Sequence, residues 1–221
     1  MIDLLVPASA RVAEAFHDDP DEPVFPGEEH LIAGAVPARR QEFVTARRCA
    51  RLALAGLGCP QVPILAGPSR APQWPDGVVG SITHAAGYRG AVVARVTDVA
   101  GIGIDAEPNR PLPPGVEELV TVAGERQALA RLAADHPETH WDRVLFSAKE
   151  SIYKAWYPLT ERWLGFEDVR LAIDPAGRFR AELLVDGTRT DGRPPLRELD
   201  GRFLVSGELI LTGVSVDTNP T

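Results

Sequence analysis

Two acidic side chains alternate at the end of a predicted strand. Asp105 and Glu107 close the segment 101–107, Gly-Ile-Gly-Ile-Asp-Ala-Glu, directly before Pro108. Residues two apart on a strand point to the same face, so the two carboxylates repel and each raises the pKa of the other. A hard cation between them removes this cost, and oxygen ligands select Mg²⁺, Ca²⁺ or Mn²⁺ over zinc and copper. Pairs of acids on exposed strand edges are common, so this pattern alone leaves a surface pair open.

A third carboxylate stands in a predicted helix over residues 141–157. Apolar side chains at 148, 152, 155 and 156 follow the helical repeat and predict a buried face. Glu150 and Lys154 lie one turn apart in the order that favours ion pairing. Two interpretations stay open. Ser147 and Glu150 match a capping box at a helix start, whereas Lys149, Glu150 and Lys154 together offer a platform for a metal ion and an anion.

A polar cluster ends the first strand of a predicted hairpin over residues 78–96. Ser81, Thr83 and His84 in the segment Ser-Ile-Thr-His could reach a phosphate, although a lone histidine at a strand end is more often structural. A Ser-His-Asp hydrolase is not supported, because Ser81 is outside a Gly-x-Ser-x-Gly turn. The sequence also has no Gly-x-x-x-x-Gly-Lys-Ser/Thr phosphate loop and no Gly-x-Gly-x-x-Gly dinucleotide turn.

Arginines form a stripe on the first predicted helix, residues 37–57. Arg40, Arg47 and Arg51 fall within about 40° of one another at 100° per residue, beside an apolar stripe. Such a stripe is either a solvated basic face or a platform for something anionic.

These candidate residues need a scaffold of helices and strands from both ends of the chain. After the first helix come the hairpin and the strand 101–107, then helices within 114–137 and 141–157. Strands at 179–185 and 202–216 follow, and 18–30 and 217–221 are expected to be an acidic surface loop and a frayed tail. This order predicts an α+β protein of two similar halves, 1–105 and 106–221.

Composition excludes several classes of function. The 221-residue chain has a net charge of −8, which argues against a nucleic-acid binder. It has no apolar run long enough to span a membrane and no basic N-terminal region typical of a secretory signal. Its two cysteines, Cys49 and Cys59, form no Cys-x-x-Cys pair. We therefore expect a cytoplasmic protein with reduced thiols.

Three ordered motifs together resemble the Sfp-type 4′-phosphopantetheinyl transferases. They are the Ser-x-Thr-His strand end at 81–84, Gly-Ile-Asp-x-Glu at 103–107, and Phe-x-x-Lys-Glu-x-x-x-Lys at 146–154. Flanking segments resemble the actinobacterial branch that activates lipid, polyketide and siderophore synthases; they lie at 47–58, 74–77 and 163–168.

The resemblance implies a fold and a set of roles. The fold is a monomer of two pseudo-symmetric α/β halves with coenzyme A in the cleft between them. The implied Mg²⁺ ligands are Asp105, Glu107 and Glu150, with Mn²⁺ as an alternative metal. Asp105, Glu150 and Lys154 would be the catalytic residues. The implied contacts to coenzyme A are made by Arg40, Arg47, Arg70, Ser81, His84, Lys149 and Lys154.

Two of these roles are more specific. His84 would lie near the 3′-phosphate, and Arg40 and Arg47 near the nucleotide end. Many members carry a Gly-Lys-Pro turn before the first motif, and here Arg70, in the segment 67–72, takes the place of the lysine.

The reaction implied by the resemblance is transfer of phosphopantetheine from coenzyme A to a serine of an apo carrier protein. Fatty-acid, polyketide and nonribosomal-peptide carriers all remain open as partners. We expect the carrier to dock on an apolar patch that includes Tyr157, Pro158 and Leu159. A catalytically silent coenzyme A or carrier-binding module and a magnesium-dependent phosphodiesterase are the alternatives, and the presence of all three carboxylates favours the transferase.

Overall fold

Two antiparallel sheets and four helices make up the computed structural model, which describes residues 1–218. The elements of the N-terminal part are β1 Arg11–Ala15, α1 Pro37–Gly56, β2 Val78–Ala85 and β3 Tyr88–Arg95. Those that follow are β4 Val99–Pro108, α2 Val116–Val120, α3 Glu125–Asp135, α4 Trp141–Thr160, β5 Val169–Asp174, β6 Arg178–Leu183, β7 Glu198–Ser206 and β8 Leu209–Asp217. The chain is therefore an α+β protein, as the order of predicted elements indicates.

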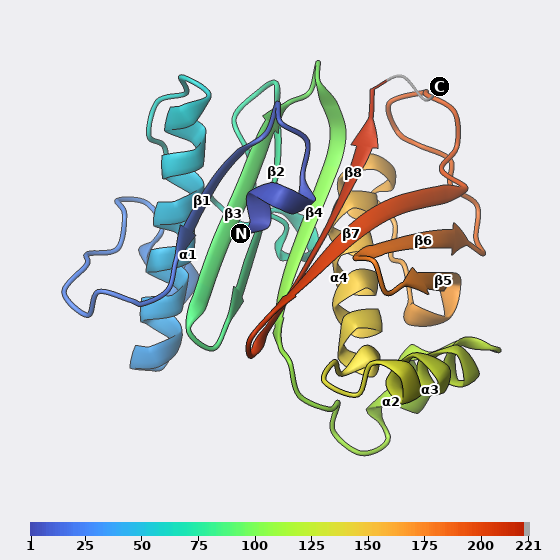
Figure 1. The fold of residues 1–221 in the computed structure, drawn as a ribbon. Helices are drawn as coiled ribbons and strands as arrows, with labels where there is room; N and C mark the ends of the chain where they lie inside the picture. Colours follow the sequence, from blue (N-terminus) through green and yellow to red (C-terminus); the bar gives the residue numbers. More distant parts are fainter. Residues whose placement is uncertain (219–221) are drawn as a thin grey trace.

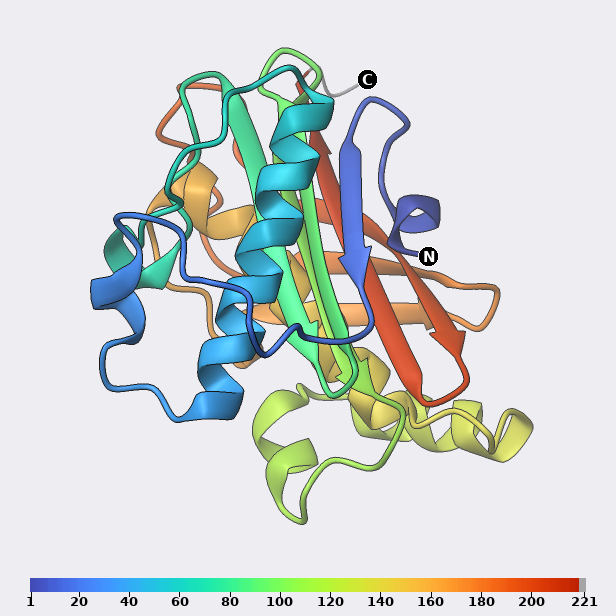
Figure 2. The ribbon, with the colours of Figure 1, turned by 90° about the vertical axis from the view of Figure 1, so that its left-hand side faces the viewer.

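The first sheet has the strand order β1-β3-β2, and α1 covers one of its faces (Figures 1 and 2). Pro37 begins the helix, where the absence of an N–H costs nothing. The predicted apolar stripe of α1 is buried, with Ala50 and Leu54 fully enclosed against Val93 of β3. This amphipathic packing fixes which face of α1 carries the arginines.

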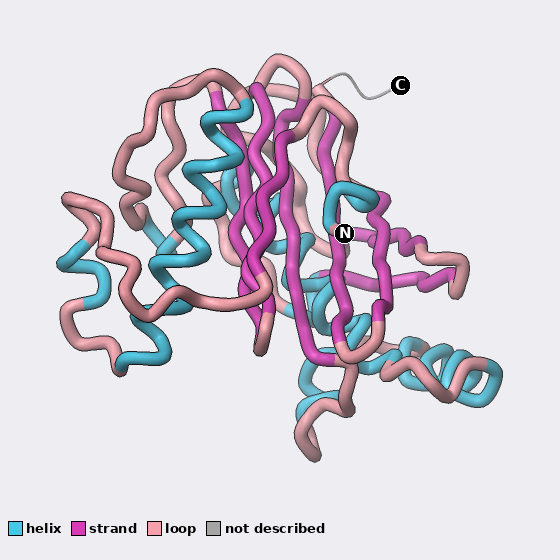
Figure 3. The backbone as a smooth tube through the Cα atoms, turned by 60° about the vertical axis from the view of Figure 1, so that its left-hand side comes forward, coloured by secondary structure: helices cyan, strands magenta, loops and turns pink. Residues whose placement is uncertain are grey.

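The second sheet has the order β4-β8-β7-β6-β5, and α4 packs across β4 and β8 (Figure 1). Its core joins Ile152 and Trp156 of α4 to Ile210 and Val214 of β8, all at most 1% exposed. Figure 3 shows the strands of both sheets running side by side through the middle of the molecule, with α1 outside them. Each sheet is therefore covered by its own 20-residue helix.

Two glycines let α4 lie directly on β4. A Cβ atom on Gly103 would stand 1.9 Å from the Ser151 carbonyl oxygen, and one on Gly101 would stand 2.8 Å from Leu159 Cδ1. Both glycines therefore face the helix. Because side chains alternate along a strand, Asp105 and Glu107 share that face. The intervening Ile102 and Ile104 fill the core on the opposite side.

Several boundaries differ from the expectations. The helix predicted within 114–137 is two helices, α2 and α3, and strands β1 and β5 were not predicted. The frayed tail was predicted to begin at residue 217, but Asp217 is still part of β8. Residues 219–221 of the predicted tail lie outside the described residues. The division into halves at residues 105 and 106 stays a prediction, and it falls inside β4.

None of the helices within residues 1–218 has both the length and the apolar character needed to cross a bilayer.

Candidate functional site

The three predicted carboxylates lie along the contact between β4 and α4. Asp105 and Glu107 extend from β4 toward the helix, and Glu150 lies on α4 between Ser147 and Lys154, one turn from each. Because α4 begins at Trp141, Ser147 is in mid-helix and the capping-box interpretation is wrong. The Ser147 hydroxyl instead donates to Asp105 Oδ2 at 2.8 Å.

Asp105 accepts more hydrogen bonds than either of the other two carboxylates. It is 6% exposed, and Lys154 Nζ donates to its Oδ1 at 2.7 Å. Lys154 also donates to the Ile104 carbonyl at 3.0 Å, and the Thr83 hydroxyl donates to Asp105 Oδ1 at 3.3 Å. Helix α4 and strand β2 therefore both bond to this one side chain, which joins the two sheets at the site.

Glu107 and Glu150 carry less compensated charge. Arg143 Nη1 donates to Glu107 Oε2 at 2.8 Å, yet burial and the neighbouring Asp105 carboxylate raise the pKa of Glu107. Burial also raises the pKa of Glu150, and the Asp105 and Glu107 carboxylates add to the effect against the opposing charge of Lys154. The three acids are thus close enough to repel, as expected for groups that share a cation.

The donor set suits a hard divalent cation, because it consists of carboxylate oxygens and two of its members are destabilised as anions. Within residues 1–218, no three histidine, cysteine, aspartate or glutamate side chains are placed to hold a metal ion together. The reason is visible in the contacts, since Asp105 and Glu107 are turned to Lys154 and Arg143. Metal binding by this set would require those side chains to exchange partners.

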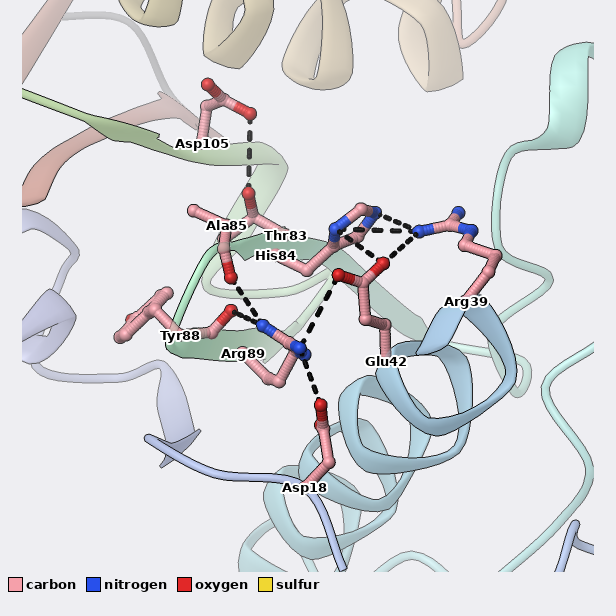
Figure 4. Close-up of polar contacts among 9 residues, drawn as sticks. All are labelled: Asp18, Arg39, Glu42, Thr83, His84, Ala85, Tyr88, Arg89 and Asp105. Atoms are coloured by element: carbon pink, nitrogen blue, oxygen red, sulfur yellow. Dashed lines mark hydrogen bonds and ion pairs between the residues drawn. The ribbon is translucent and has the colours of Figure 1, made fainter. Parts of the chain in front are cut away.

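A second charged cluster lies on the other side of β2 (Figure 4). Adjacent residues of a strand point to opposite faces, so Thr83 turns to Asp105 while His84 turns to α1. Arg39 Nη1 lies 2.6 Å from His84 Nε2, and Glu42 Oε2 lies 3.7 Å from His84 Nδ1. Burial and then the Arg39 charge lower the pKa of His84, so its neutral ring accepts the bond from Arg39. This cluster can offer donors to an anion.

A small, largely apolar cavity of about 90 Å³ adjoins Glu150. Its walls come from α4 and the segment after it, and the lining side chains include Tyr153, Trp163, Leu164 and Phe166. The Tyr153 and Trp163 rings lie 5.1 Å apart between centroids, and Trp163 is 74% exposed. The cavity therefore places aromatic side chains beside Glu150.

Comparisons with known proteins identify the family to which the chain is similar. Residues 27–94 match the model of the 4′-phosphopantetheinyl transferase N-terminal domain, and residues 101–196 match that of the 4′-phosphopantetheinyl transferase superfamily. The chain is 53% identical to 4′-phosphopantetheinyl transferase Svp of Streptomyces mobaraensis, over 98% of this chain and 89% of that protein. The chain belongs to the 4′-phosphopantetheinyl transferase superfamily.

Two further relatives support this assignment to the superfamily. The chain is 49% identical to transferase PptT of Mycobacterium tuberculosis, over 91% of this chain and 90% of that one. It is 47% identical to transferase Npt of Nocardia iowensis, over 97% and 99%. The resemblance to the actinobacterial branch is thereby confirmed, and the protein is an enzyme that transfers phosphopantetheine from coenzyme A to carrier proteins.

The predicted arginines of this transferase have different positions on α1. Arg51 is buried, and its Nη1 donates to Glu28 Oε1 at 2.7 Å. The anion that pairs with this arginine of the predicted stripe is therefore Glu28, from the acidic loop. Arg47 donates to the Ile64 carbonyl at 3.1 Å, and burial lowers its pKa to about 10. Arg40 is exposed, and within residues 1–218 it is Arg39 that contacts His84. The role predicted for Arg40, a contact at the nucleotide end of coenzyme A, stays a prediction.

Two other residues predicted to contact phosphate, Ser81 and Lys149, are buried in the structure. The Ser81 hydroxyl is 3% exposed and accepts from the Ile104 amide at 3.1 Å, because alternation turns it toward β4 with Thr83. Lys149 points away from Glu150 into a buried site. There its amino group donates to Glu125 Oε2 and to the Val120 and Phe166 carbonyls, and no donor is left for a phosphate.

The role predicted for Arg70, a contact with coenzyme A, stays a prediction. It is exposed at the end of a short turn, Pro68–Arg70, in which Ser69 and Arg70 both have positive φ. No contact among the described residues joins it to His84.

Sequence reasoning missed four charged residues that contact predicted ones: Arg39 and Glu42 beside His84, Arg143 beside Glu107, and Glu125 beside Lys149. Each of them contacts the site from a distant segment of the chain. The sequence shows that a charged residue is present there, but it does not show which residue that charge contacts.

Proposed function

We propose that Asp105, Glu107 and Glu150 form the catalytic centre of this transferase and hold Mg²⁺, with Mn²⁺ as an alternative metal. The observation that carries the proposal is the row of three mutually repelling carboxylates on β4 and α4, of which Asp105 accepts a hydrogen bond from Lys154. When bound there, Mg²⁺ would polarise the pyrophosphate of coenzyme A and stabilise the leaving group.

Coenzyme A would lie across β2 and α4. The Arg39–His84 cluster would receive the 3′-phosphate, and Arg40, Arg47 and Arg70 would lie toward the nucleotide end. The pyrophosphate would lie near Lys154. The pantetheine arm, which is flexible and largely apolar, would extend toward the cavity beside Glu150 lined by Tyr153 and Phe166.

In the transfer step, the carrier's serine oxygen forms a bond to the β-phosphorus of coenzyme A. The bond from that phosphorus to the bridging oxygen breaks, and 3′,5′-adenosine bisphosphate leaves. Glu150 accepts the serine proton, because its raised pKa brings it nearer to the pH at which a general base is effective. The Lys154 ammonium neutralises charge on the leaving group.

The carrier would approach on the aromatic side of α4. Leu159 is 6% exposed and is therefore removed from the expected docking patch, whereas Trp163 is prominently exposed beside Tyr153. Tyr157 lies next to Tyr153, with ring centroids 5.9 Å apart. We propose that the enzyme acts as a monomer in the cytoplasm, on acyl or peptidyl carrier domains of fatty-acid, polyketide, siderophore or other nonribosomal-peptide synthesis.

Intact-mass spectrometry tests the proposal. A panel of apo carriers is incubated with coenzyme A, Mg²⁺ and either the wild type, Glu150→Gln or Asp105→Ala, and the wild type is repeated in EDTA. The wild type should add one phosphopantetheine group, and both variants and the EDTA sample should add none. Glu198→Gln, at the exposed start of β7, makes the same charge change away from the site and should keep the activity.

Two results would contradict the proposal. Near-normal turnover by Glu150→Gln would remove Glu150 as the base. Tight binding of coenzyme A without transfer to any carrier would favour the silent binding module, and release of phosphopantetheine to water without a carrier would favour the phosphodiesterase.

A further inference from the structure

Glu42 lies at the centre of three nitrogen-bearing groups near the end of β2 (Figure 4). Its Oε2 is 3.2 Å from Arg39 Nη1 and 3.7 Å from His84 Nδ1, and its Oε1 is 3.5 Å from Arg89 Nη2. The Glu42 side chain is 28% exposed, so solvent and ligands can reach it. One carboxylate thus contacts every donor group that the cluster offers.

Arg89 cannot move to make room for another anion. Its side chain is 7% exposed, its Nη2 donates to Asp18 Oδ2 at 2.6 Å, and its Nη1 donates to the Tyr88 carbonyl at 2.8 Å and to the Ala85 carbonyl. Asp18 on the far side is likewise only 17% exposed. The mobile members of the cluster are therefore Arg39, His84 and Glu42, whose side chains are 50%, 38% and 28% exposed.

The positions of the Glu42 oxygens match those a phosphate would use. A phosphate oxygen bound to Arg39 and His84 would stand about 3 Å from both nitrogens, which is the space that Glu42 Oε2 takes. Two anions so close repel at any effective dielectric constant of a partly exposed site. A phosphate can bind there only if the Glu42 carboxylate turns away.

We infer that Glu42 is an intramolecular competitor of the 3′-phosphate, which the incoming nucleotide must displace from Arg39 and His84. This inference rests on the proposed function, because it takes the Arg39–His84 cluster as the phosphate site. It makes Glu42 a specificity residue. Ligands that carry the phosphate recover the two bonds after displacement, and ligands without it leave Glu42 in place.

The experiment compares the Kd of coenzyme A with that of dephospho-coenzyme A, which lacks only the 3′-phosphate. Isothermal titration calorimetry is run on the wild type, Glu42→Gln and the charge-matched control Glu198→Gln, at the exposed start of β7. Glu42→Gln should tighten coenzyme A by about fivefold at low salt and change dephospho-coenzyme A less than twofold. Glu198→Gln should change neither. Glu42→Ala gives a second test without the amide.

A further variant separates failure of this inference from failure of the proposed phosphate site. His84→Ala should weaken coenzyme A and reduce its advantage over dephospho-coenzyme A. If His84→Ala leaves that advantage unchanged, the phosphate lies elsewhere and both proposals are wrong. If His84→Ala removes it but Glu42→Gln and Glu42→Ala bind coenzyme A no tighter than the wild type, the competitor role alone is refuted and Glu42 merely positions Arg39.

Discussion

The contact between Gly103 and α4 determines how close the proposed catalytic groups of strand and helix can come, and Gly103→Ala tests it. The added Cβ would stand 1.9 Å from the Ser151 carbonyl oxygen, 2.7 Å from the Ala155 amide nitrogen and 3.0 Å from the Ser151 carbonyl carbon. All three atoms belong to the backbone of α4, so no side chain can rotate to relieve the overlap. The helix must move away from β4.

The size of the displacement follows from the same distances. Ordinary van der Waals contact begins at 3.4 Å, so the Ser151 oxygen has to retreat by about 1.5 Å. Overpacking of a core costs about 1–3 kcal/mol, and we expect the upper end because backbone is involved. For a domain of this length, 3 kcal/mol corresponds to a fall in Tm of roughly 6–12 °C.

The effect on the reaction should exceed the effect on stability. Lys154 Nζ and the Ser147 hydroxyl bond to Asp105 at 2.7 and 2.8 Å, and both move with the helix. Misplacing a catalytic group by about 1 Å can reduce the rate about 100-fold. Carrier loading by mass spectrometry, at a temperature where the variant is folded by circular dichroism, should show that loss.

Two controls make this prediction refutable. Gly34→Ala adds a Cβ that meets nothing within 4 Å and should leave both Tm and rate unchanged. Gly101→Ala meets the flexible Leu159 side chain at 2.8 Å and the Ala155 carbonyl oxygen at 3.0 Å, a milder overlap with backbone than at Gly103, and should have an intermediate effect. A Gly103→Ala protein with wild-type Tm and rate would show that α4 is not held against β4 as described.

Two further predictions concern buried charges. Lys149→Met breaks the buried ion pair with Glu125 and should lower the free energy of unfolding, measured in urea, by about 3 kcal/mol. The affinity for coenzyme A should change less than twofold; a larger change would indicate that Lys149 contacts a phosphate of coenzyme A. Burial and neighbouring carboxylates raise the pKa of Glu150, so the folded state binds that proton more tightly and stability falls as the pH rises from 4.5 through the raised pKa. Glu150→Gln should therefore have the higher Tm at neutral pH in EDTA, with no difference below pH 4.5; equal Tm values throughout would contradict this.

The sequence alone was sufficient to predict which faces of β4 and α4 carry the three carboxylates and Lys154. Strand alternation places Asp105 and Glu107 on one side, and the apolar stripe of α4 orients Glu150 and Lys154. The strand β5 could also have been found, since Val169–Asp174 alternates buried and less buried residues. β1 carries only one β-branched residue, Val12, so its pairing with β3 is a tertiary effect.

The partners of charged residues could not be predicted in the same way. Lys149 and Glu150 are adjacent, but a rotation of about 100° per residue sends them to different sides of α4, and only the position of Glu125 shows where Lys149 is bound. Arg39 and Arg40 are chemically alike, and only the approach of β2 to α1 distinguishes them. Local periodicity therefore predicts faces, whereas ion pairs depend on which distant segment meets each face.

The ion pairs within the site suggest how a protein with a net charge of −8 can bind a highly anionic substrate. Arg39 and Arg89 contact Glu42, and Lys154 contacts Asp105, so both proposed binding regions pair each cation with an acid of the same chain. Binding then exchanges one anionic partner for another and does not require attraction at long range. Such an exchange of partners favours a ligand whose anionic groups replace all of the ion pairs that are broken within the chain. A nucleotide with its 3′-phosphate and pyrophosphate would do so at Glu42 and, with Mg²⁺, at Asp105, whereas a ligand with only one of these groups would leave the other acid paired within the chain.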